Sequence, residues 1–383
     1  MIIHIVKPNE TIYTIARSYG VPPSQIINDN ELSDPNKLVV GQTLVILYSS
    51  TVKQGTMSVS GYAYPYISED VLRKTLPYLT YITIFSYAFD ENGNLFDIDD
   101  EEIISISKEY GVAPILVVTT LTPEGLFGSE LSHKLMNDPA MQDRLTANLL
   151  DVVGEKGYYG VNIDFEYIYA EDRDLFSEFI RKIALIMNEH GYILTVALAP
   201  KTSSDQVGLL YEGHDYKALG EAADWVLLMT YEWGYAYGPP MAVAPINKVK
   251  EVLDYAVSEI DPQKILMGIP NYGYDWQLPF VRGTRATTMG NVEAVDQAAD
   301  VLTAIMYDEV AQSPYYNYHK DGNGHIVWFE DARSIETKLQ TANDYGLMGV
   351  EYWHLMKFFP QNWLVLNAQY NIEKTGGTGD TRF

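Results

Sequence analysis

The sequence of 383 residues contains no cysteine and only seven histidines. The lack of cysteine excludes disulfide bonds, thiolate zinc sites and a thiol nucleophile. The histidines show no spacing typical of metal ligands. A phosphate-binding loop and a serine nucleophile elbow are also missing from the sequence. We therefore predict neither a metal nor another cofactor.

Positive charge is also scarce, since 26 Lys and Arg stand against 51 Asp and Glu, giving a net charge of −25. Nucleic acids and anionic membranes repel such a protein, so we exclude both as main partners. No run of about 18 apolar residues could span a membrane. Residues 1–8 include no basic segment followed by a long apolar run, so no signal peptide is expected. The hydrophobic content of 47% allows a sizeable core.

The first part of the chain has the pattern of a small separate module. A short alternating strand at 3–6 precedes a helix with apolar residues at helical spacing over 12–19. Gly20 is expected to end that helix. A second short helix begins at the Pro22-Pro23 pair, and a closing strand is expected over 43–47. The pattern predicts a β-α-α-β order.

This order, together with Asn30 and the run 40–44, resembles a lysin-motif (LysM) domain. The resemblance implies a carbohydrate-binding domain over residues 1–48 that binds N-acetylglucosamine polymers such as chitin or peptidoglycan. A small packing domain without a ligand is the alternative. Residues 49–60 lack an apolar period and are expected to form a linker. A merely tethered module could be deleted with little effect on the turnover of short soluble oligosaccharides.

From residue 61 onward, eight apolar strand-like runs alternate with amphipathic helical segments, most clearly at 172–190. This pattern predicts an α/β fold, a (β/α)₈ or TIM barrel over residues 61–383, with its active site at the C-terminal ends of the strands. The runs are 61–66, 81–90, 113–120, 160–167, 193–200, 225–233, 265–272 and 348–355.

The longest gap lies between the seventh and eighth runs, at about residues 277–330. It contains strand-like pieces at 315–319 and 325–329 and a helical segment near 295–310. The segment is too apolar for a disordered loop. We therefore predict a small α+β insertion that forms one wall of the active-site cleft.

The fourth run carries a row of polar side chains. Asn162, Asp164 and Glu166 alternate with apolar residues, so the three share one face of a strand. A carboxylate away from water costs several kcal/mol, or shifts its pKa, unless it is paired. An exposed edge strand is the alternative, but the intervening residues are more apolar than an edge requires. The pattern favours an active-site row in which one acid is kept protonated by its neighbour.

This run resembles the catalytic motif Asp-Gly-x-Asp-x-Asp-x-Glu of family-18 glycoside hydrolases. Gly160, Asp164 and Glu166 match the motif, whereas Tyr159 and Asn162 replace its first two acids. The second replacement removes a carboxylate that could share a proton with Asp164. We expect the Asn162 amide to donate to Asp164 instead and to keep that acid charged over a wider pH range. Restoring an acid at 162 should then alter the pH–rate profile and retain activity.

Later runs carry further parts of the resemblance. Residues 229–232 are similar to the family's Met-x-Tyr-Asp motif, and residues 268–273 to its Gly-x-Pro-x-Tyr-Gly run. The resemblance implies that Tyr231 donates its hydroxyl to the substrate's acetamido group and that Trp353 forms the floor beneath the sugar. A barrel-core role is the alternative for each of these two. Further candidates for sugar contacts are Tyr62, Tyr87, Glu232, Trp233, Asn271 and Trp276.

The resemblance implies a substrate-assisted mechanism, an exception among glycosidases. Glu166 would protonate the glycosidic oxygen, and the substrate's own acetamide would attack to form an oxazolinium ion. Asp164 and Tyr231 would orient and stabilise the acetamide. Water activated by Glu166 would then complete hydrolysis with retention.

Both domains together resemble bacterial spore-cortex-lytic N-acetylglucosaminidases, with shared runs at 229–235, 272–276 and 325–332. The resemblance implies action on the N-acetylglucosamine links of cortex peptidoglycan. It also implies synthesis in the mother cell and deposition in the coat or cortex region, with the cytoplasm as the alternative. A chitinase or chito-oligosaccharide hydrolase is one alternative function, although a secreted chitinase should carry an export signal. A non-catalytic lectin is another, favoured by Asn162 and opposed by Glu166.

Overall fold

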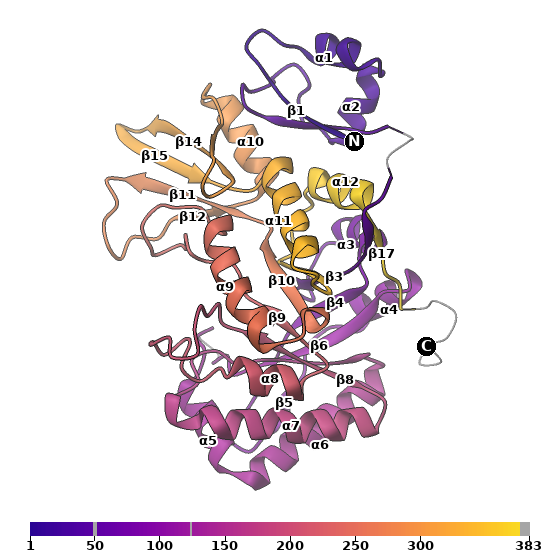
Figure 1. The fold of residues 1–383 in the computed structure, drawn as a ribbon, viewed down its shortest axis with the longest axis vertical. Helices are drawn as coiled ribbons and strands as arrows, with labels where there is room; N and C mark the ends of the chain where they lie inside the picture. Colours follow the sequence, from indigo (N-terminus) through magenta and orange to yellow (C-terminus); the bar gives the residue numbers. More distant parts are fainter. Residues whose placement is uncertain (49–51, 123–124, 376–383) are drawn as a thin grey trace.

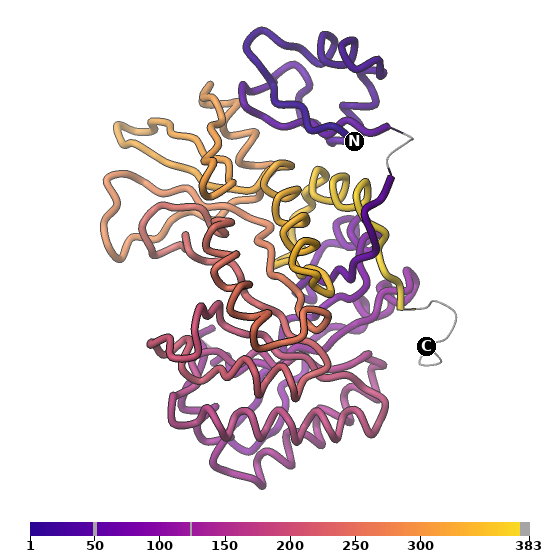
Figure 2. The backbone as a smooth tube through the Cα atoms, viewed as in Figure 1, coloured from indigo at the N-terminus to yellow at the C-terminus, as the bar shows by residue number. Residues whose placement is uncertain are grey.

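The structure is a computed structural model that describes residues 1–48, 52–122 and 125–375 (Figure 1). The N-terminal module lies at one end of the long axis, and the barrel helices α5–α8 lie at the other. Figure 2 shows that the indigo module lies next to the orange insertion and the yellow C-terminal helix, which are far from it in sequence. Among the described residues, no helix is both long and apolar enough to cross a membrane.

The module has the predicted β-α-α-β order. Its elements are β1 (Ile2–Ile5), α1 (Ile12–Tyr19), α2 (Pro23–Asp29) and β2 (Thr43–Ile46), and β1 pairs antiparallel with β2. The side chain of Thr11 accepts a hydrogen bond from the backbone of Thr14 and so caps the start of α1. Gly20 ends the helix in the left-handed region, at φ 68°, as predicted.

Eight parallel strands close into the predicted TIM barrel, since β3 pairs with both β4 and β16. A short strand, β17 (Tyr370–Ile372), adds to the outer end of β3, and β5 (Leu95–Phe96) pairs antiparallel with β4. The barrel strands are β3 (Gly55–Ala63), β4 (Tyr81–Phe89), β6 (Ala113–Thr119), β7 (Gly160–Asp164), β8 (Ile193–Leu198), β9 (Trp225–Leu228), β10 (Ile265–Pro270) and β16 (Gly349–Trp353).

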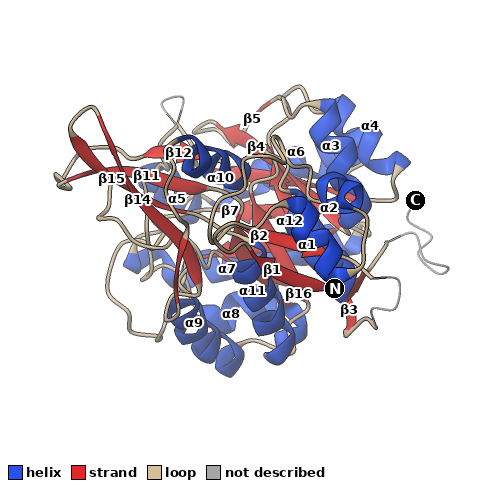
Figure 3. Cartoon of the chain, turned by 90° about the horizontal axis from the view of Figure 1, so that it is seen from above, coloured by secondary structure: helices blue, strands red, loops and turns tan. Residues whose placement is uncertain are grey.

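Helices surround the barrel, and the main apolar core lies between them and the strands (Figure 3). The amphipathic segment predicted at 172–190 forms α7 (Arg173–Glu189), which buries its apolar stripe against the barrel. The other helices are α3 (Glu69–Thr75), α4 (Glu101–Glu109), α5 (Ser129–Asn137), α6 (Pro139–Lys156), α8 (Tyr216–Ala222), α9 (Ile246–Glu259), α11 (Ala332–Asp344) and α12 (Pro360–Gln369), with short 3₁₀ turns at Leu76–Tyr78, Ala170–Asp172 and Pro262–Lys264.

The α+β insertion lies between β10 and β16, the seventh and eighth barrel strands, as predicted. It consists of β11 (Gly273–Leu278), β12 (Thr287–Met289), α10 (Asn291–Asp300), β13 (Met306–Asp308), β14 (Ser313–Lys320) and β15 (Asn323–Trp328). These strands form an antiparallel sheet in the order β12-β11-β15-β14-β13.

Two predicted boundaries of the insertion are wrong. The insertion begins at Gly273 rather than 277, because β11 already pairs with β15 from Tyr274 onward. Its helix ends at Asp300 rather than 310, and Leu302 then takes the left-handed φ of 52°. The apolar residues beyond this point belong to strand β13 and to the segment that leads into it.

The predicted linker over residues 49–60 is too long. Strand β3 already begins at Gly55, because this stretch pairs with β17 on one side and buries Met57 and Val59 in the barrel core. The part of the linker at 49–51 lies outside the described residues. The module is therefore joined to the barrel by a short segment.

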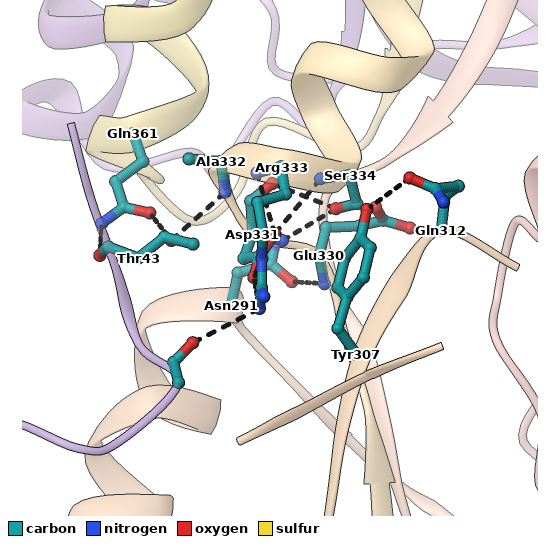
Figure 4. A network of polar contacts seen from close by, with 11 residues as sticks. Thr43, Asn291, Tyr307, Gln312, Glu330, Asp331, Ala332, Arg333, Ser334 and Gln361 are labelled. Carbon is teal, nitrogen blue, oxygen red and sulfur yellow. Dashed lines mark hydrogen bonds and ion pairs between the residues drawn. The ribbon is translucent and has the colours of Figure 1, made fainter. Parts of the chain in front are cut away.

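The module is also docked on the barrel domain and not merely tethered, contrary to our expectation. Val39 packs into the apolar core of the insertion, and the Ile305 N–H donates to the Val40 carbonyl at 2.9 Å. Figure 4 shows Gln361 of α12 facing Thr43 of β2. The Gln361 amide donates to the Thr43 carbonyl at 2.6 Å and accepts from its hydroxyl at 2.7 Å. These buried contacts fix the module on α12 and the insertion.

Candidate active site

A cleft of about 720 Å³ opens at the C-terminal ends of the barrel strands. Its wall is mainly aromatic, and three acids also line it. Its one histidine, His354, has a pKa lowered by burial. The lining residues include Tyr62, Tyr64, Phe85, Phe127, Asp164, Glu166, Tyr167, Tyr211, Met229, Tyr231, Glu232, Trp233, Tyr235, Tyr272, Tyr274, Trp353 and His354.

The two motif acids stand where the fourth barrel strand ends. Asp164 is the last residue of β7, and Glu166 follows in the loop, so that both enter the cleft. Phe165 between them is fully buried and stacks on Phe179 of α7. Directly after Glu166, Tyr167 adopts a left-handed φ of 58°, a backbone conformation that costs of order 1–3 kcal/mol and clusters at functional sites.

Both acids are more easily protonated than an exposed carboxyl group. Burial raises the pKa of Asp164 to about 7, and the negative charge of Glu351 adds to the rise. Burial also raises the pKa of Glu166 well above its ordinary value, with further contributions from Asp164 and Glu232. The raised pKa favours the protonated form of Glu166, the form that a general acid requires.

Asn162 lies beneath the cleft and not beside its opening. Its amide donates to Thr195 Oγ1 at 2.7 Å, and its carbonyl accepts from Tyr62 Oη at 3.1 Å. The expected hydrogen bond to Asp164 is wrong: Asp164 Oδ1 is buried and has no partner among the described residues. The expectation that Asp164 stays charged over a wider pH range is also wrong, because burial and Glu351 raise its pKa.

Tyr231 and Glu232 follow β9 and also line the cleft. Tyr231 can pack tightly here because Gly268 of β10 has no side chain; a Cβ at Gly268 would lie 2.7 Å from the Tyr231 ring. Glu232 is exposed as a whole residue, but its Oε1 accepts hydrogen bonds from the Tyr272 hydroxyl and from the Tyr274 hydroxyl, the latter at 3.0 Å. Burial of this carboxyl raises its pKa, and the two hydrogen bonds oppose the rise.

Trp353 at the end of β16 forms part of the cleft floor. Its ring makes edge contacts with Phe85 and Tyr62, at centroid distances of 5.0 and 5.2 Å. These neighbours contact the indole from the side, and Trp353 remains partly exposed where it lines the cleft. Such a ring can stack on the apolar face of a sugar.

Comparison with known proteins agrees with this geometry. Residues 61–357 match the family described as Glycosyl hydrolases family 18, and residues 4–47 match the LysM domain. The chain is a family-18 glycoside hydrolase with an N-terminal LysM domain.

Full-length relatives share both domains of this family-18 enzyme. It is 38% identical to a cortical fragment-lytic enzyme of Bacillus anthracis, over 97% of this chain and 99% of the relative. It is 34% identical to the protein of the same name from Bacillus subtilis strain 168, over 98% and 99%. The crystal structure of the spore cortex-lytic enzyme SleL of Bacillus megaterium QM B1551 is similar, with a TM-score of 0.92, 34% identity and coverage of 97% and 98%.

Most predicted site residues of this enzyme line one cleft, but, besides Asn162 beneath it, three others do not. Tyr87 is fully buried and donates to Asp100 at 2.7 Å, on the far side of its strand. Asn271 is buried and donates to the carbonyls of His354 and Lys357. Trp276 is buried in the insertion and donates to the Gly238 carbonyl at 3.0 Å. All three side chains stabilise the fold, so the predicted sugar contacts are wrong for them.

The sequence analysis missed several cleft residues. Tyr64 follows Tyr62 by two positions, and Tyr274 follows Tyr272 in the same way, so alternation along the chain could have indicated both. Glu351 is buried two positions before Trp353. Alternation along β16 could therefore also have indicated that its side chain shares a face with that of Trp353. Phe127, Tyr211 and Tyr235 come from loops and carry no periodic signal. In the described part of the chain, no group of three or more His, Asp or Glu side chains could hold a metal.

Proposed function

We propose that this family-18 enzyme hydrolyses N-acetylglucosamine linkages of peptidoglycan, in particular that of the spore cortex, with retention of the anomeric configuration. The observation that carries the proposal is the acid pair at the end of β7. Burial raises the pKa of Glu166 well above its ordinary value inside an aromatic cleft, and Asp164 lies two residues before it. A protonated carboxyl group in such a cleft is suited to donate a proton to a leaving glycosidic oxygen.

In the proposed mechanism, Glu166 protonates the glycosidic oxygen. The carbonyl oxygen of the substrate's 2-acetamido group attacks the anomeric carbon and gives an oxazolinium ion. Asp164 accepts a hydrogen bond from the acetamide N–H, and Tyr231 donates one to its carbonyl oxygen. Glu166 then takes a proton from water, which opens the ring with retention.

The surroundings of Glu232 support the use of the substrate's own acetamide. Glu232 is the other acid lining the cleft within the described residues, and its Oε1 already accepts from two tyrosine hydroxyls. A carboxylate committed in this way is a poor nucleophile. The commitment of Glu232 thus supports a nucleophile supplied by the substrate.

The choice of peptidoglycan rests on both domains and on the relatives. LysM modules suit N-acetylglucosamine polymers, and the relatives are named cortical fragment-lytic or spore cortex-lytic enzymes. These names also support our proposal that the enzyme is made in the mother cell and deposited in the coat or cortex region of the spore.

Mass spectrometry of fragments released from purified cortex peptidoglycan tests the proposal. We expect N-acetylglucosamine at the new reducing ends, and muramic acid there would contradict the assigned linkage. Chitin oligosaccharides, digested in parallel, test the chitinase alternative, which faster cleavage of chitin than of cortex would favour. The Glu166→Gln variant serves as the inactive control for both substrates.

A further inference from the structure

A second cavity lies where the LysM module meets the barrel domain. It has a volume of about 260 Å³ and shares no lining residue with the catalytic cleft. One wall comes from the loop between α2 and β2, at residues 30–37, and another from α10 of the insertion. The residues just before α11 and the first residues of α12 complete the lining. The cavity therefore exists only while the module is docked.

Side chains of both domains meet at the exposed rim of this cavity. The Ser33 hydroxyl of the module donates to Asp296 Oδ1 of α10 at 2.6 Å. Lys37 of the module forms an ion pair with Asp300, the last residue of α10, at 3.2 Å. Both contacts join the module loop to α10, so they set the separation of these two walls.

Buried polar groups line the cavity on another side, which includes Gln361 and Glu330 (Figure 4). Gln361 Nε2 donates to Asn30 Oδ1 of the module at 3.2 Å. Glu330 is 1% exposed, and its Oε2 accepts from Lys338 at 2.8 Å. Its Oε1 is buried and has no hydrogen-bond partner among the described residues. A buried acceptor without a donor is costly, and a ligand with hydroxyl groups is a source of donors.

Docking alone does not explain the cavity. Well-packed protein contacts leave few voids larger than a water molecule, whereas this gap persists between walls that already contact each other. A gap filled only by water is the alternative. Ligand sites occur preferentially at domain interfaces, which favours a ligand here.

The charges of the lining residues favour an uncharged ligand. Acids far outnumber the one lysine in the lining, so an anion such as phosphate is repelled. Four of the acids already form ion pairs with lysine or arginine, which leaves little free negative charge to attract a cation. In the described part of the chain, no group of three or more His, Asp or Glu side chains could hold a metal.

Apolar side chains on α10 supply the other half of the recognition chemistry. Val292, Val295 and Ala299 lie at helical spacing and line the cavity with Asp296 between them. A ligand that fits has both hydrogen-bonding groups and apolar C–H surface, as an N-acetylated sugar has in its hydroxyls, acetamide and ring face. The volume lies at the lower end of ligand pockets and suits a single sugar.

We propose that this cavity is a second glycan site, built jointly by the module and the barrel domain, that takes one uncharged N-acetylated sugar of a strand outside the catalytic cleft. The inference rests on the proposed function for the class of substrate. A strand held at this site has a higher effective concentration at the cleft. Docking of the module thus creates a binding site that neither domain has alone.

Methyl NMR of the full chain, labelled at alanine, valine and methionine, tests the proposal with N-acetylglucosamine as the probe. The methyl groups of Ala299 and Val295 report on the cavity, and that of Met229 reports on the cleft. We expect saturable shifts at Ala299 and Val295, with a Kd on the order of 1 mM for a single sugar. Shifts at Met229 alone would overturn the inference and leave a gap filled by water.

Glucosamine is the matched probe, because it carries an ammonium group in place of the acetamide. It should shift the Ala299 and Val295 signals only at higher concentration than N-acetylglucosamine. Tighter binding of glucosamine would show that the acids select a cation, and would overturn the assignment of an uncharged ligand.

Two neutralised acids of the insertion give a matched pair of variants. Asp296→Asn weakens the acceptor on the cavity wall, so the affinity measured at Val295 should fall about five-fold. Asp321→Asn changes an exposed acid on the turn between β14 and β15 and should leave that affinity unchanged. Equal affinity in both variants would contradict the proposed contact with α10.

A second pair tests whether both domains are needed. In Gly41→Ala, the new Cβ would lie 1.9 Å from the Ile305 carbonyl oxygen, so the walls should separate and the response at Val295 should disappear. Gly20→Ala, with nothing within 4 Å of the new Cβ, should retain it. An undiminished response in Gly41→Ala would overturn a jointly built site.

Hydrolysis of cortex peptidoglycan by the parent chain is measured separately. A chain that is active on cortex but shows no response at Ala299 and Val295 would lose this inference and keep the proposed function. A chain that is inactive on cortex would lose the proposed function whatever the methyl signals show. The two failures are therefore distinguishable.

Discussion

Glu166 combines two properties that acids on a protein surface lack, a pKa raised well above its ordinary value and access to a cleft. Burial supplies the first property, and its position two residues beyond Asp164 at the open end of β7 supplies the second. The neighbouring charges of Asp164 and Glu232 strengthen the first, because a second negative charge nearby is unfavourable.

The Glu166→Gln variant should therefore lose about 10²–10⁴-fold in kcat, the usual contribution of a positioned acid–base group. The amide has the same shape and cannot donate the required proton, so the affinity for an oligosaccharide should be retained. Turnover and equilibrium binding of the same oligosaccharide measure the two effects. Glu171→Gln, at an exposed site on the same loop, is the matched control and should behave like the parent. Equal turnover of the Glu166→Gln variant and the parent would show that another residue is the acid.

At the residue scale, strand alternation predicted the acids well and the aromatic residues less well. Asp164, Glu166, Tyr231 and Trp353 line the cleft because they stand at the C-terminal ends of strands. Tyr87 also stands near the end of a strand, but it faces the outer helices and binds Asp100. Alternation separates the two faces of a strand without revealing which face an isolated tyrosine takes.

At the element scale, a buried histidine fixes the end of the catalytic strand. The Nδ1 atom of His214 accepts from the Ala199 N–H beyond β8, and its Nε2–H donates to the Phe165 carbonyl beyond β7, both at 3.0 Å. This pairing assigns the proton to Nε2. The ring thereby joins two strand ends and holds the backbone between Asp164 and Glu166.

His214 should make stability depend on pH. Burial lowers its pKa from 6.5 to about 4, and nearby Lys201 adds to this effect. Between these values the unfolded chain binds a proton that the folded chain does not, so stability is lost as the pH falls from 6.5 toward 4. Urea unfolding of the parent and of His214→Gln at pH 7 and pH 5 measures the effect. The parent should lose about 2 kcal/mol more than the variant over this interval. An equal loss in both proteins would contradict the assignment.

The elements themselves were predictable because the barrel strands are rich in apolar β-forming residues, as expected of a sheet covered on both faces. The ends of the strands were not predictable from the sequence in the same way. We expected runs to 167 and 233, whereas β7 ends at Asp164 and β9 at Leu228. Aromatic residues continue the strand-like composition into the loops, where Tyr167 and Glu232 take left-handed backbone conformations. These exceptions lie at the cleft, where the backbone does not follow the local secondary-structure preference of its residues.

At the scale of the whole molecule, the sequence indicated two domains but not their docking. The docking contacts join residues far apart in the chain, such as Thr43 with Gln361 and Val40 with Ile305. A short polar segment between two folded domains is compatible with either a tether or a fixed interface. The buried contacts favour the fixed interface, so deletion of the module should not be neutral for the barrel domain.

Gly41 offers a test of this interface that leaves the chain intact. It adopts a φ of 87°, and a Cβ at this position would lie 1.9 Å from the Ile305 carbonyl oxygen of the insertion. Gly41→Ala should therefore force the module away from the insertion. Gly20 has a similar φ of 68° and has nothing within 4 Å of its Cβ position. Gly20→Ala thus introduces the same backbone strain, about 1–2 kcal/mol, without touching the interface.

Limited proteolysis with mass analysis of the fragments compares the two variants. In Gly41→Ala, we expect cleavage between the module and the barrel to accelerate several-fold, because undocking lets the connecting segment adopt the conformations that a protease requires. In Gly20→Ala, cleavage there should remain close to that of the parent. Since the interface lies on α12 and the insertion, Gly41→Ala should also lower the melting temperature of the barrel domain beyond the shift that Gly20→Ala produces. Equal cleavage and equal melting shifts in both variants would show that the module is held by its connecting segment alone.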